Sequence, residues 1–252
     1  MEGLGILSPH FDDAAFSLCL SLARWCSLQM KVRVVNVFTV SAYGPRMEAT
    51  DRLAVSSVRE GEDRRVTKRI GAAISIESLR LLDAPIRLHI NVGSVFQPES
   101  SAPQHGSGNE EKSLACWIRM QLRERFVMAP LGLGNHIDHL LVKAAAEKAL
   151  ASHKLAFYED LPYAAWTTEA ALHERIAETE RKIGALLRPV VIRSKNAIPR
   201  KRRIITGYQS QISPEEAAMI ARFAGRYGGG ERIWIPKHSK SWQDLACGAN
   251  EI

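Results

Sequence analysis

The sequence predicts an α/β protein of the doubly wound, Rossmann-like kind, in which helices cover both faces of a mostly parallel sheet. Short apolar runs alternate along the chain with longer charged or amphipathic segments. The apolar runs are rich in β-branched residues and lack the strict alternation of a sheet with one face in water. This order of strand-like and helix-like segments is typical of parallel strands joined by crossover helices.

The elements follow one another in a regular order. Six strands are predicted from short apolar runs: residues 3–8, 31–40, 78–82, 126–130, 155–158 and 190–192. The segments between them carry alanine, leucine and charged residues at helical spacing. They predict helices over residues 14–28, 47–71, 110–125, 138–153 and 169–187.

Two stretches interrupt this alternation. Residues 91–109 are rich in proline, glycine and serine, and they predict a long loop that is either mobile or a lid over a site. Residues 200–252 show a less regular pattern, in which Ser213 followed by Pro214 marks a helix start. We expect a single domain over residues 1–252 that includes this less regular C-terminal region.

The composition is that of a globular protein. Of the 252 residues, 46% are hydrophobic and 24% are charged, which excludes a disordered or fibrous chain. The formal net charge of +7 favours acidic partners. However, the basic run at residues 200–203 is expected to be a solvated surface. Nucleic-acid binding there would need interleaved aromatic residues, and Tyr208 is the one aromatic residue near the run.

The sequence predicts a cytoplasmic protein. Its four cysteines form no C-x-x-C pair, so a reducing compartment fits better than a disulfide framework. The first residues lack the basic segment and long apolar stretch of a signal peptide. The apolar segment 14–25 is too short to span a bilayer, so no membrane span is expected.

Polar side chains suited to metal binding directly follow the first predicted strand. His10, Asp12 and Asp13 lie within four residues of one another, before the first predicted helix. In open α/β sheets, ligands bind beyond the carboxyl ends of the strands. The sequence therefore predicts a site at this edge of the sheet.

A second group of the same kind follows the strand predicted at residues 126–130. His136, Asp138 and His139 open the next predicted helix. The spacing of three places His136 and His139 on the same side of a first helical turn. We therefore expect both groups at the same edge of the sheet.

The two groups together provide the side chains of a hydrolytic metal site. Such a zinc site uses three nitrogen or oxygen ligands and keeps one position open for water, whose pKa falls to about 7. A carboxylate that is not a ligand can accept a proton from water. The remaining histidine can act as a cation that stabilises the developing oxyanion.

Other interpretations of these residues stay open. Asp12, Asp13 and Asp138 could cap helices. His10 could be a hydrogen-bonded core residue. Two histidines and one carboxylate also suit non-haem Fe(II), so the metal could be Fe²⁺ and the protein an oxygenase.

These two groups resemble the signature elements of the PIG-L/LmbE-like deacetylase family, a PHxDD-type and an HxDH-type element. They stand here as Pro9-His10-Phe11-Asp12-Asp13 and His136-Ile137-Asp138-His139. Residues 59–63, 82–85, 158–163 and 208–211 look like weaker signatures of the family, so the resemblance extends to about residue 211. The chain departs from the common pattern at Phe11 and Ala14, where many members have proline and glutamate. These departures suggest a subgroup acting on glycosylated or aminoglycoside-like metabolites.

The resemblance implies an LmbE-like fold, one bound Zn²⁺ and removal of an N-acetyl group from an amino sugar or N-acetylglucosaminyl conjugate. His10, Asp13 and His139 would bind the metal, and Asp12 would be the general base. The expected partner is this small N-acetylated sugar or glycoconjugate. A homo-oligomer is compatible with the sequence, and a nucleic-acid-binding protein with a vestigial metal site is a rival hypothesis.

The resemblance also implies roles around this centre. His136 would polarise the substrate carbonyl or protonate the leaving amine, and Asp138 would hold the ring of His136 in orientation. Four further residues are expected to contact the substrate or line its pocket: Arg59, Asp83, Tyr158 and Asp160.

Overall fold

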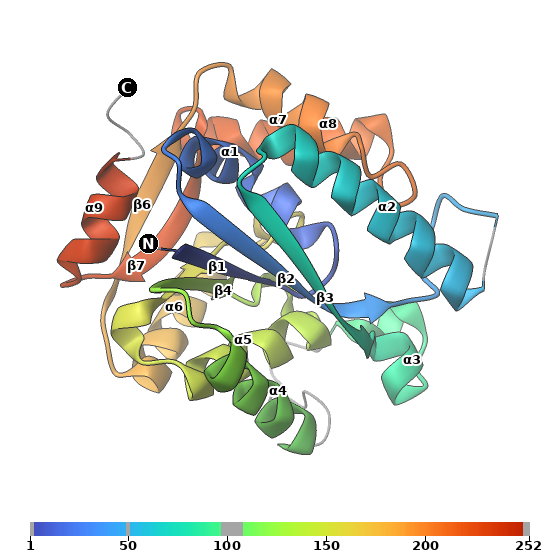
Figure 1. Cartoon of the computed structure of the whole chain (residues 1–252), viewed down its shortest axis with the longest axis horizontal. Coiled ribbons are helices and arrows are strands. Elements are labelled where there is room, and N and C mark those ends of the chain that lie inside the picture. Colours follow the sequence, from blue (N-terminus) through green and yellow to red (C-terminus); the bar gives the residue numbers. More distant parts are fainter. Residues whose placement is uncertain (1–2, 49–50, 97–107, 249–252) are drawn as a thin grey trace.

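A seven-stranded sheet forms the centre of the computed structural model, which describes residues 3–48, 51–96 and 108–248 (Figure 1). The strand order is β3-β2-β1-β4-β5-β7-β6. All neighbouring strands from β3 to β5 are parallel, and β7 is antiparallel to β5 and β6. The strands are β1 (Gly3–Ser8), β2 (Lys31–Val40), β3 (Ile74–Leu82), β4 (Phe126–Pro130), β5 (Leu155–Tyr158), β6 (Leu187–Arg193) and β7 (Gly230–Pro236).

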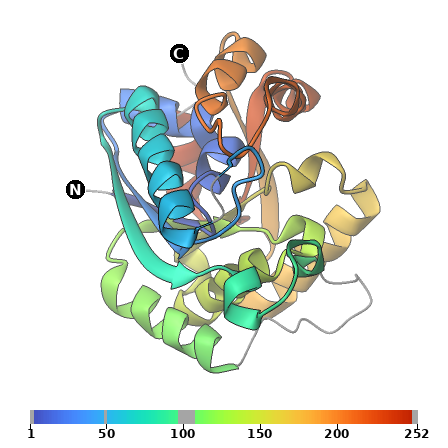
Figure 2. The same cartoon turned by 90° about the vertical axis from the view of Figure 1, so that its right-hand side faces the viewer.

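Helices cover both faces of this sheet, as predicted (Figures 1 and 2). One face carries α1 (Asp13–Ser27), α2 (Arg52–Ile70), α7 (Ala197–Ile205) and α8 (Pro214–Phe223). The other face carries α4 (Gly108–Gln121), α5 (Ile137–Ala149) and α6 (Glu169–Ile183). The short α3 (Ala84–Leu88) follows β3, and α9 (Lys240–Gly248) packs against β6 and β7. The mostly parallel α/β fold expected from the sequence is thereby confirmed.

Burial explains the sequence pattern of the central elements. Helix α1 is apolar on most sides because it lies between the sheet and α2 and α7, so Leu18 and Trp25 are fully buried. Strand β3 begins earlier than the predicted strand at residues 78–82, because Ile74 and Ile76 pair with β2.

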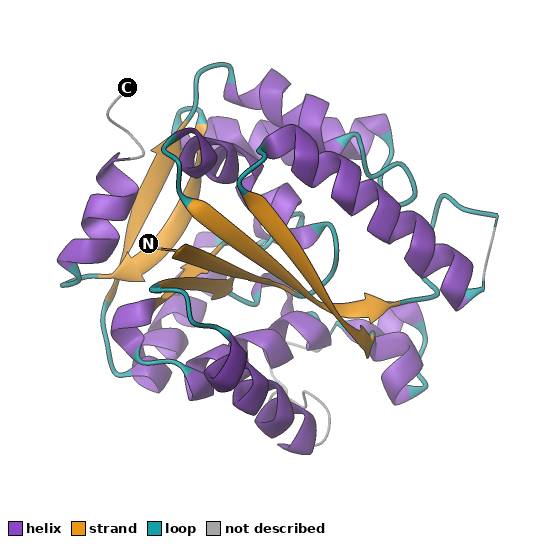
Figure 3. Cartoon of the chain, viewed as in Figure 1, coloured by secondary structure: helices purple, strands orange, loops and turns teal. Residues whose placement is uncertain are grey.

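The C-terminal part is more regular than predicted (Figure 3). Within residues 200–248, the structure contains most of α7, the whole of α8 with its Ser213 capping box, β7 and α9. Strand β7 inserts between β5 and β6, and Trp234 lies opposite Phe157 and Pro189. Local periodicity could not predict this insertion, because the position of a strand in a sheet depends on distant partners. That residues 1–252 form a single domain stays a prediction.

The basic run at residues 200–203 is not uniformly exposed, contrary to expectation. Arg200, Arg202 and Arg203 are exposed, but Lys201 is fully buried. Its Nζ lies 2.6 Å from Oε1 of Glu231, because a buried charge requires an opposite partner.

Two other expectations concern segments rather than side chains. Most of the predicted loop at residues 91–109 lies outside the described residues, since 97–107 are not described and α4 already begins at Gly108. Among the residues that are described, no helix is long and apolar enough to cross a membrane.

Candidate metal and active site

The two predicted groups meet at the carboxyl edge of the sheet. Strands β1 and β4 are parallel neighbours, so the turn after Ser8 and the loop after Pro130 leave the sheet side by side. Ser8 fixes the first turn, because its Oγ donates to the carbonyl of His10 and accepts from the N–H of Ala14. The loop after β4 needs glycine at Gly134, where φ is +74° and a Cβ atom would meet the side chain of Tyr163.

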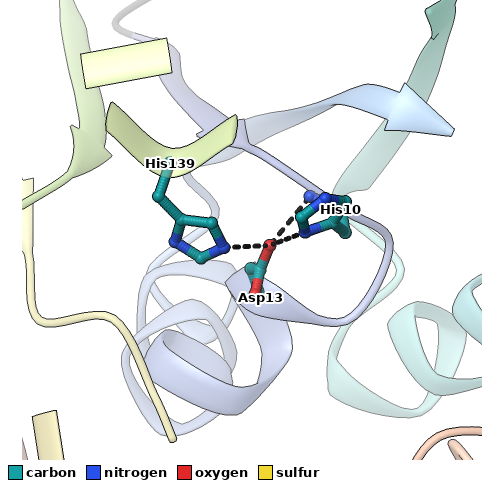
Figure 4. A group of neighbouring side chains, drawn as sticks. All are labelled: His10, Asp13 and His139. Atoms are coloured by element: carbon teal, nitrogen blue, oxygen red, sulfur yellow. Dashed lines mark hydrogen bonds and ion pairs between the residues drawn. The ribbon is translucent and has the colours of Figure 1, made fainter. Parts of the chain in front are cut away.

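Asp13 joins the two groups (Figure 4). Its Oδ2 lies 3.1 Å from Nδ1 of His10 and 3.2 Å from Nε2 of His139. The backbone N–H of His10 donates to the same oxygen at 2.8 Å. One ligand atom from each of the three side chains lies within 4.8 Å of the other two, so the convergence expected from the sequence is present.

The second nitrogen of each of these histidines contacts a buried carboxylate. Nε2 of His10 lies 3.0 Å from Oδ2 of Asp138, and Nδ1 of His139 lies 2.6 Å from Oδ1 of Asp160. Both aspartates are fully buried. Each contact fixes the orientation of one ring and leaves its other nitrogen directed at Asp13.

Asp138 therefore does not orient His136 through its carboxylate, as the family resemblance had implied. Oδ2 of Asp138 also accepts the N–H of Ala84 at 3.0 Å, and Oδ1 accepts from Arg87 at 2.9 Å. Although burial opposes ionisation, the neighbouring His10 and Arg87 hold the pKa of Asp138 well below its usual range. The contact of Asp138 with His10 joins two distant chain segments, so the local HxDH pattern could not predict it.

His136 is a neutral hydrogen-bonding group rather than the expected cation. Its Nδ1 accepts the backbone N–H of Asp138 at 3.2 Å, so His136 caps α5. Burial, together with the positive charges of His139 and His10, holds the pKa of His136 well below its usual range. In the neutral ring, Nε2 carries the proton and is free to donate it to an acceptor.

Asp12 does not cap α1 through its side chain. It occupies the N-cap position without a side-chain cap hydrogen bond, and its Oδ1 accepts from Arg59 at 3.2 Å. Arg59, which was expected to contact substrate, is buried and also donates to Oγ of Ser41. The structure thus places Arg59 behind Asp12.

The other predicted substrate residues have internal partners. Asp83 caps α3, because its side chain accepts the N–H of Ile86. Tyr158 is fully buried and its hydroxyl donates to the carbonyl of Leu7 at 2.9 Å. Asp160 accepts from the N–H groups of Gly132 and Leu133 besides contacting His139. The side chains of Tyr158 and Asp160 are fully buried, and their role in the substrate pocket stays a prediction.

Sequence reasoning missed Arg87 as part of this centre. It lies on α3 and links Asp138 to Oε1 of Glu110, which is 3.0 Å from its Nε. Its guanidinium also lies 4.6 Å from the ring centroid of Phe38. The one available signal was its place four residues after Asp83, just past a predicted strand end.

Comparison with known proteins identifies the family. Residues 6–150 match the family described as GlcNAc-PI de-N-acetylase, PIG-L. This chain belongs to that family. It is 31% identical over 236 residues to the 2'-N-acetylparomamine deacetylase of Streptomyces fradiae. The aligned region covers 91% of this chain and 80% of that protein.

Solved structures share the fold of this PIG-L family member. The teicoplanin deacetylase Orf2, in its zinc-inhibited form, is 21% identical with a TM-score of 0.63, covering 92% of this chain and 96% of that one. The A40926 pseudoaglycone deacetylase Dbv21 is 22% identical with a TM-score of 0.63, covering 94% and 98%. Family membership confirms hydrolytic removal of an N-acetyl group as the reaction. The nucleic-acid-binding and oxygenase alternatives are not favoured.

The donor atoms of this PIG-L family member fit a bound metal ion. Nε2 of His139 is buried, and among the described residues its contact with Asp13 at 3.2 Å is an ion pair without hydrogen-bond geometry. A tetrahedral ion with ligand bonds of about 2.0 Å places ligand atoms about 3.3 Å apart, close to the separations around Asp13. A second set, in which His10 is joined by His136 and Asp138, also converges, but Asp138 is already engaged by Arg87.

The neighbouring carboxylates determine the protonation of the His10 and His139 rings. Burial opposes the charged form of His10, but Asp13 and Asp138 outweigh it and raise its pKa to about 9. Likewise, Asp13 and Asp160 outweigh burial and raise the pKa of His139 to about 10. A metal ion that binds here displaces protons from both rings.

Proposed function

We propose that this chain is a zinc-dependent deacetylase that hydrolyses the N-acetyl group of an amino sugar or N-acetylglucosaminyl glycoconjugate. Acetate and a free amine are the products. The observation that carries the proposal is the position of the Asp13 carboxylate between His10 and His139. The relative from Streptomyces fradiae acts, by its name, on 2'-N-acetylparomamine.

His10, Asp13 and His139 would hold the metal ion. A bound zinc ion acts as a Lewis acid and lowers the pKa of water to about 7. Fe²⁺ would suit the same donors. Asp138 and Asp160 support the proposal because each holds a ligand histidine from behind, an arrangement that orients metal-binding imidazoles.

Asp12 would act as the general base. It accepts a proton from water as the oxygen attacks the acetyl carbonyl carbon, and the proton then passes to the nitrogen as the C–N bond breaks. Arg59 holds the Asp12 carboxylate in place from the buried side. A small exposed fraction of the Asp12 side chain, 11%, leaves it accessible to water.

His136 would stabilise the negative charge that develops on the carbonyl oxygen. Its Nε2–H is a neutral donor, since Nδ1 is occupied by the N–H of Asp138. A fixed donor directed at a developing oxyanion lowers the barrier because it needs no reorganisation. Arg59 would shape the substrate side of the site by holding Asp12 in place. Asp83 would do so by capping α3.

The remaining expectations are part of the same proposal. We propose that residues 1–252 act as one domain on a small N-acetylated sugar or glycoconjugate. The cytoplasmic location stays a prediction from the sequence.

The test is acetate release from N-acetylglucosamine, N,N'-diacetylchitobiose and 2'-N-acetylparomamine, with and without a chelator. We expect chelation to abolish release and zinc to restore it. Asp12→Asn should keep its zinc and lose about 10²- to 10⁴-fold in kcat. Asp244→Asn, an exposed change on α9, is the matched control. Normal turnover in Asp12→Asn would show that the base is assigned wrongly.

A further inference from the structure

Three aromatic side chains, Phe96, Tyr163 and Trp166, form a continuous surface beside the metal site. We call them the aromatic platform. The ring centroids of Phe96 and Tyr163 lie 5.6 Å apart, and those of Tyr163 and Trp166 lie 6.5 Å apart. Both pairs meet edge to face, an arrangement that stabilises aromatic contacts.

The platform begins at the proposed catalytic centre. The ring of Tyr163 lies 5.2 Å from that of His139, and the ring of Phe96 lies 5.5 Å from that of His136. A backbone bridge also joins Phe96 to His136. Trp166 contacts Tyr163 and lies one ring further out, so the platform leads away from the metal ligands.

Two of the three rings of the platform are unusually exposed. Trp166 is 62% exposed and Phe96 is 46% exposed. Within the described part of the chain, the one other exposed aromatic side chain of Phe, Tyr or Trp type is Tyr43. Tyr43, Phe96 and Trp166 follow the carboxyl ends of β2, β3 and β5 respectively.

Exposed aromatic residues at one edge of a sheet indicate ligand binding rather than packing. Grouped apolar side chains on a surface cost solvation free energy, and such groups mark binding sites. Ligand sites are lined mainly by apolar and aromatic side chains with a few polar groups for orientation. Here the polar groups are those of the adjoining centre, Asp12 and His136.

We propose that the aromatic platform is the subsite for the unit attached to the acetylated sugar, and that Trp166 determines specificity for two-ring substrates. This inference rests on the proposed function. The acetylated ring must place its amide at Asp12 and His136, where Tyr163 and Phe96 adjoin it. The ring or aglycone linked to it then lies over Trp166, with its C–H face against the indole. A single-ring substrate does not reach Trp166.

Steady-state kinetics of Trp166→Ala test the proposal. With N,N'-diacetylchitobiose and 2'-N-acetylparomamine as two-ring substrates, we expect kcat/KM to fall about 3- to 10-fold, mainly through KM, from the lost ring contact. With N-acetylglucosamine as the one-ring substrate, kcat/KM should stay unchanged. Leu186→Ala, an exposed apolar change at the opposite edge of the sheet, is the control and should affect neither class. An equal loss for both classes, or no loss for either, overturns the proposal.

A binding measurement separates this inference from the proposed function. Of the five tryptophans, Trp166 is the most exposed, so ring stacking on it should shift the fluorescence of the holoenzyme. We expect the two-ring probes to shift the emission of the wild type but not that of Trp166→Phe. If no probe releases acetate, the proposed function fails and this titration alone decides the platform. An absent shift in the wild type, or a change of oligomeric state in Trp166→Ala by light scattering, contradicts it.

Discussion

Oδ2 of Asp138 lies 3.0 Å from Nε2 of His10, although 128 positions separate the two residues. Asp160 likewise contacts His139, with its Oδ1 at 2.6 Å from Nδ1 of the ring. Carboxylates in this position usually strengthen metal binding 10- to 100-fold. We expect Asp138→Asn and Asp160→Asn each to weaken zinc affinity by about this factor, measured by competition with a chromogenic chelator. Asp83→Asn is the control, because Asp83 caps a helix, and this variant should keep wild-type zinc affinity. A similar loss of zinc affinity in Asp83→Asn would contradict the assignment.

The metal-free protein should lose stability as pH rises. The folded-state pKa values of His10 and His139 are about 9 and about 10, above the ordinary value of 6.5. Groups whose pKa is raised by folding stabilise the fold fully below the unfolded pKa and cease to do so as pH passes the folded pKa. Chelator-treated protein should therefore become less stable between about pH 6.5 and 10.

Thermal unfolding at a series of pH values measures this effect. The double variant His10→Gln/His139→Gln is the control, because it lacks both titrating rings. Its unfolding temperature should fall less steeply with pH than that of the wild type. Parallel slopes for the two proteins would show that these rings carry no such linkage.

The sequence allowed the centre itself to be predicted, because its residues lie at strand ends. His10 and Asp13 follow β1, and His139 follows β4, and carboxyl ends of adjacent parallel strands meet at one edge. The element order could be predicted for the same reason: each helix and strand leaves a local periodic pattern.

The partners of this centre could not be predicted, because they depend on distant segments. Asp160 contacts His139, and Arg87 reaches Asp138 from α3. A carboxylate after a strand has the same local pattern whether it faces a ligand or the back of a histidine. For Asp160, the pairing of β5 with β4 decides between these two roles, and the sequence does not reveal that pairing.

A buried ion pair should make Lys201 the sensitive residue of the basic run. Lys201 pairs with Glu231, which also accepts the N–H groups of Leu20 and Ser21 inside α1. Removing one partner of a buried pair leaves the other charge uncompensated, at a cost of about 3–5 kcal/mol. We expect Lys201→Met to lower the free energy of unfolding by this amount, measured by denaturant titration.

The exposed neighbour Arg202 provides the matched control. Arg202→Met should change the free energy of unfolding by less than about 0.5 kcal/mol. The double variant Lys201→Met/Glu231→Gln should recover part of the loss, because it removes the stranded charge. Equal effects of Lys201→Met and Arg202→Met would contradict a structural role for the pair.

Asp63 should make stability depend on pH near neutrality. Burial raises its pKa from 3.8 to about 7, despite hydrogen bonds from Tyr208 at 2.7 Å and Asn36 at 2.8 Å. Because folding raises this pKa, the stability it contributes is complete below about pH 3.8 and is lost as pH rises through about 7. The wild type should therefore become less stable from pH 4 to pH 8 through this group.

Asp63→Asn isolates this effect, because asparagine resembles the protonated acid in shape and does not titrate. The neighbouring Oδ1 of Asn36 has no hydrogen-bond partner among the described residues, so rotation of that amide can accept the new N–H group. The hydroxyl of Tyr208 keeps a second acceptor in the carbonyl of Phe11. Denaturant titrations at pH 5 and pH 8 measure the free energy of unfolding of both proteins. Relative to the wild type, the variant should be more stable at pH 8 than at pH 5. A difference that is the same at both pH values would mean that Asp63 is ionised throughout, with its two donors outweighing burial.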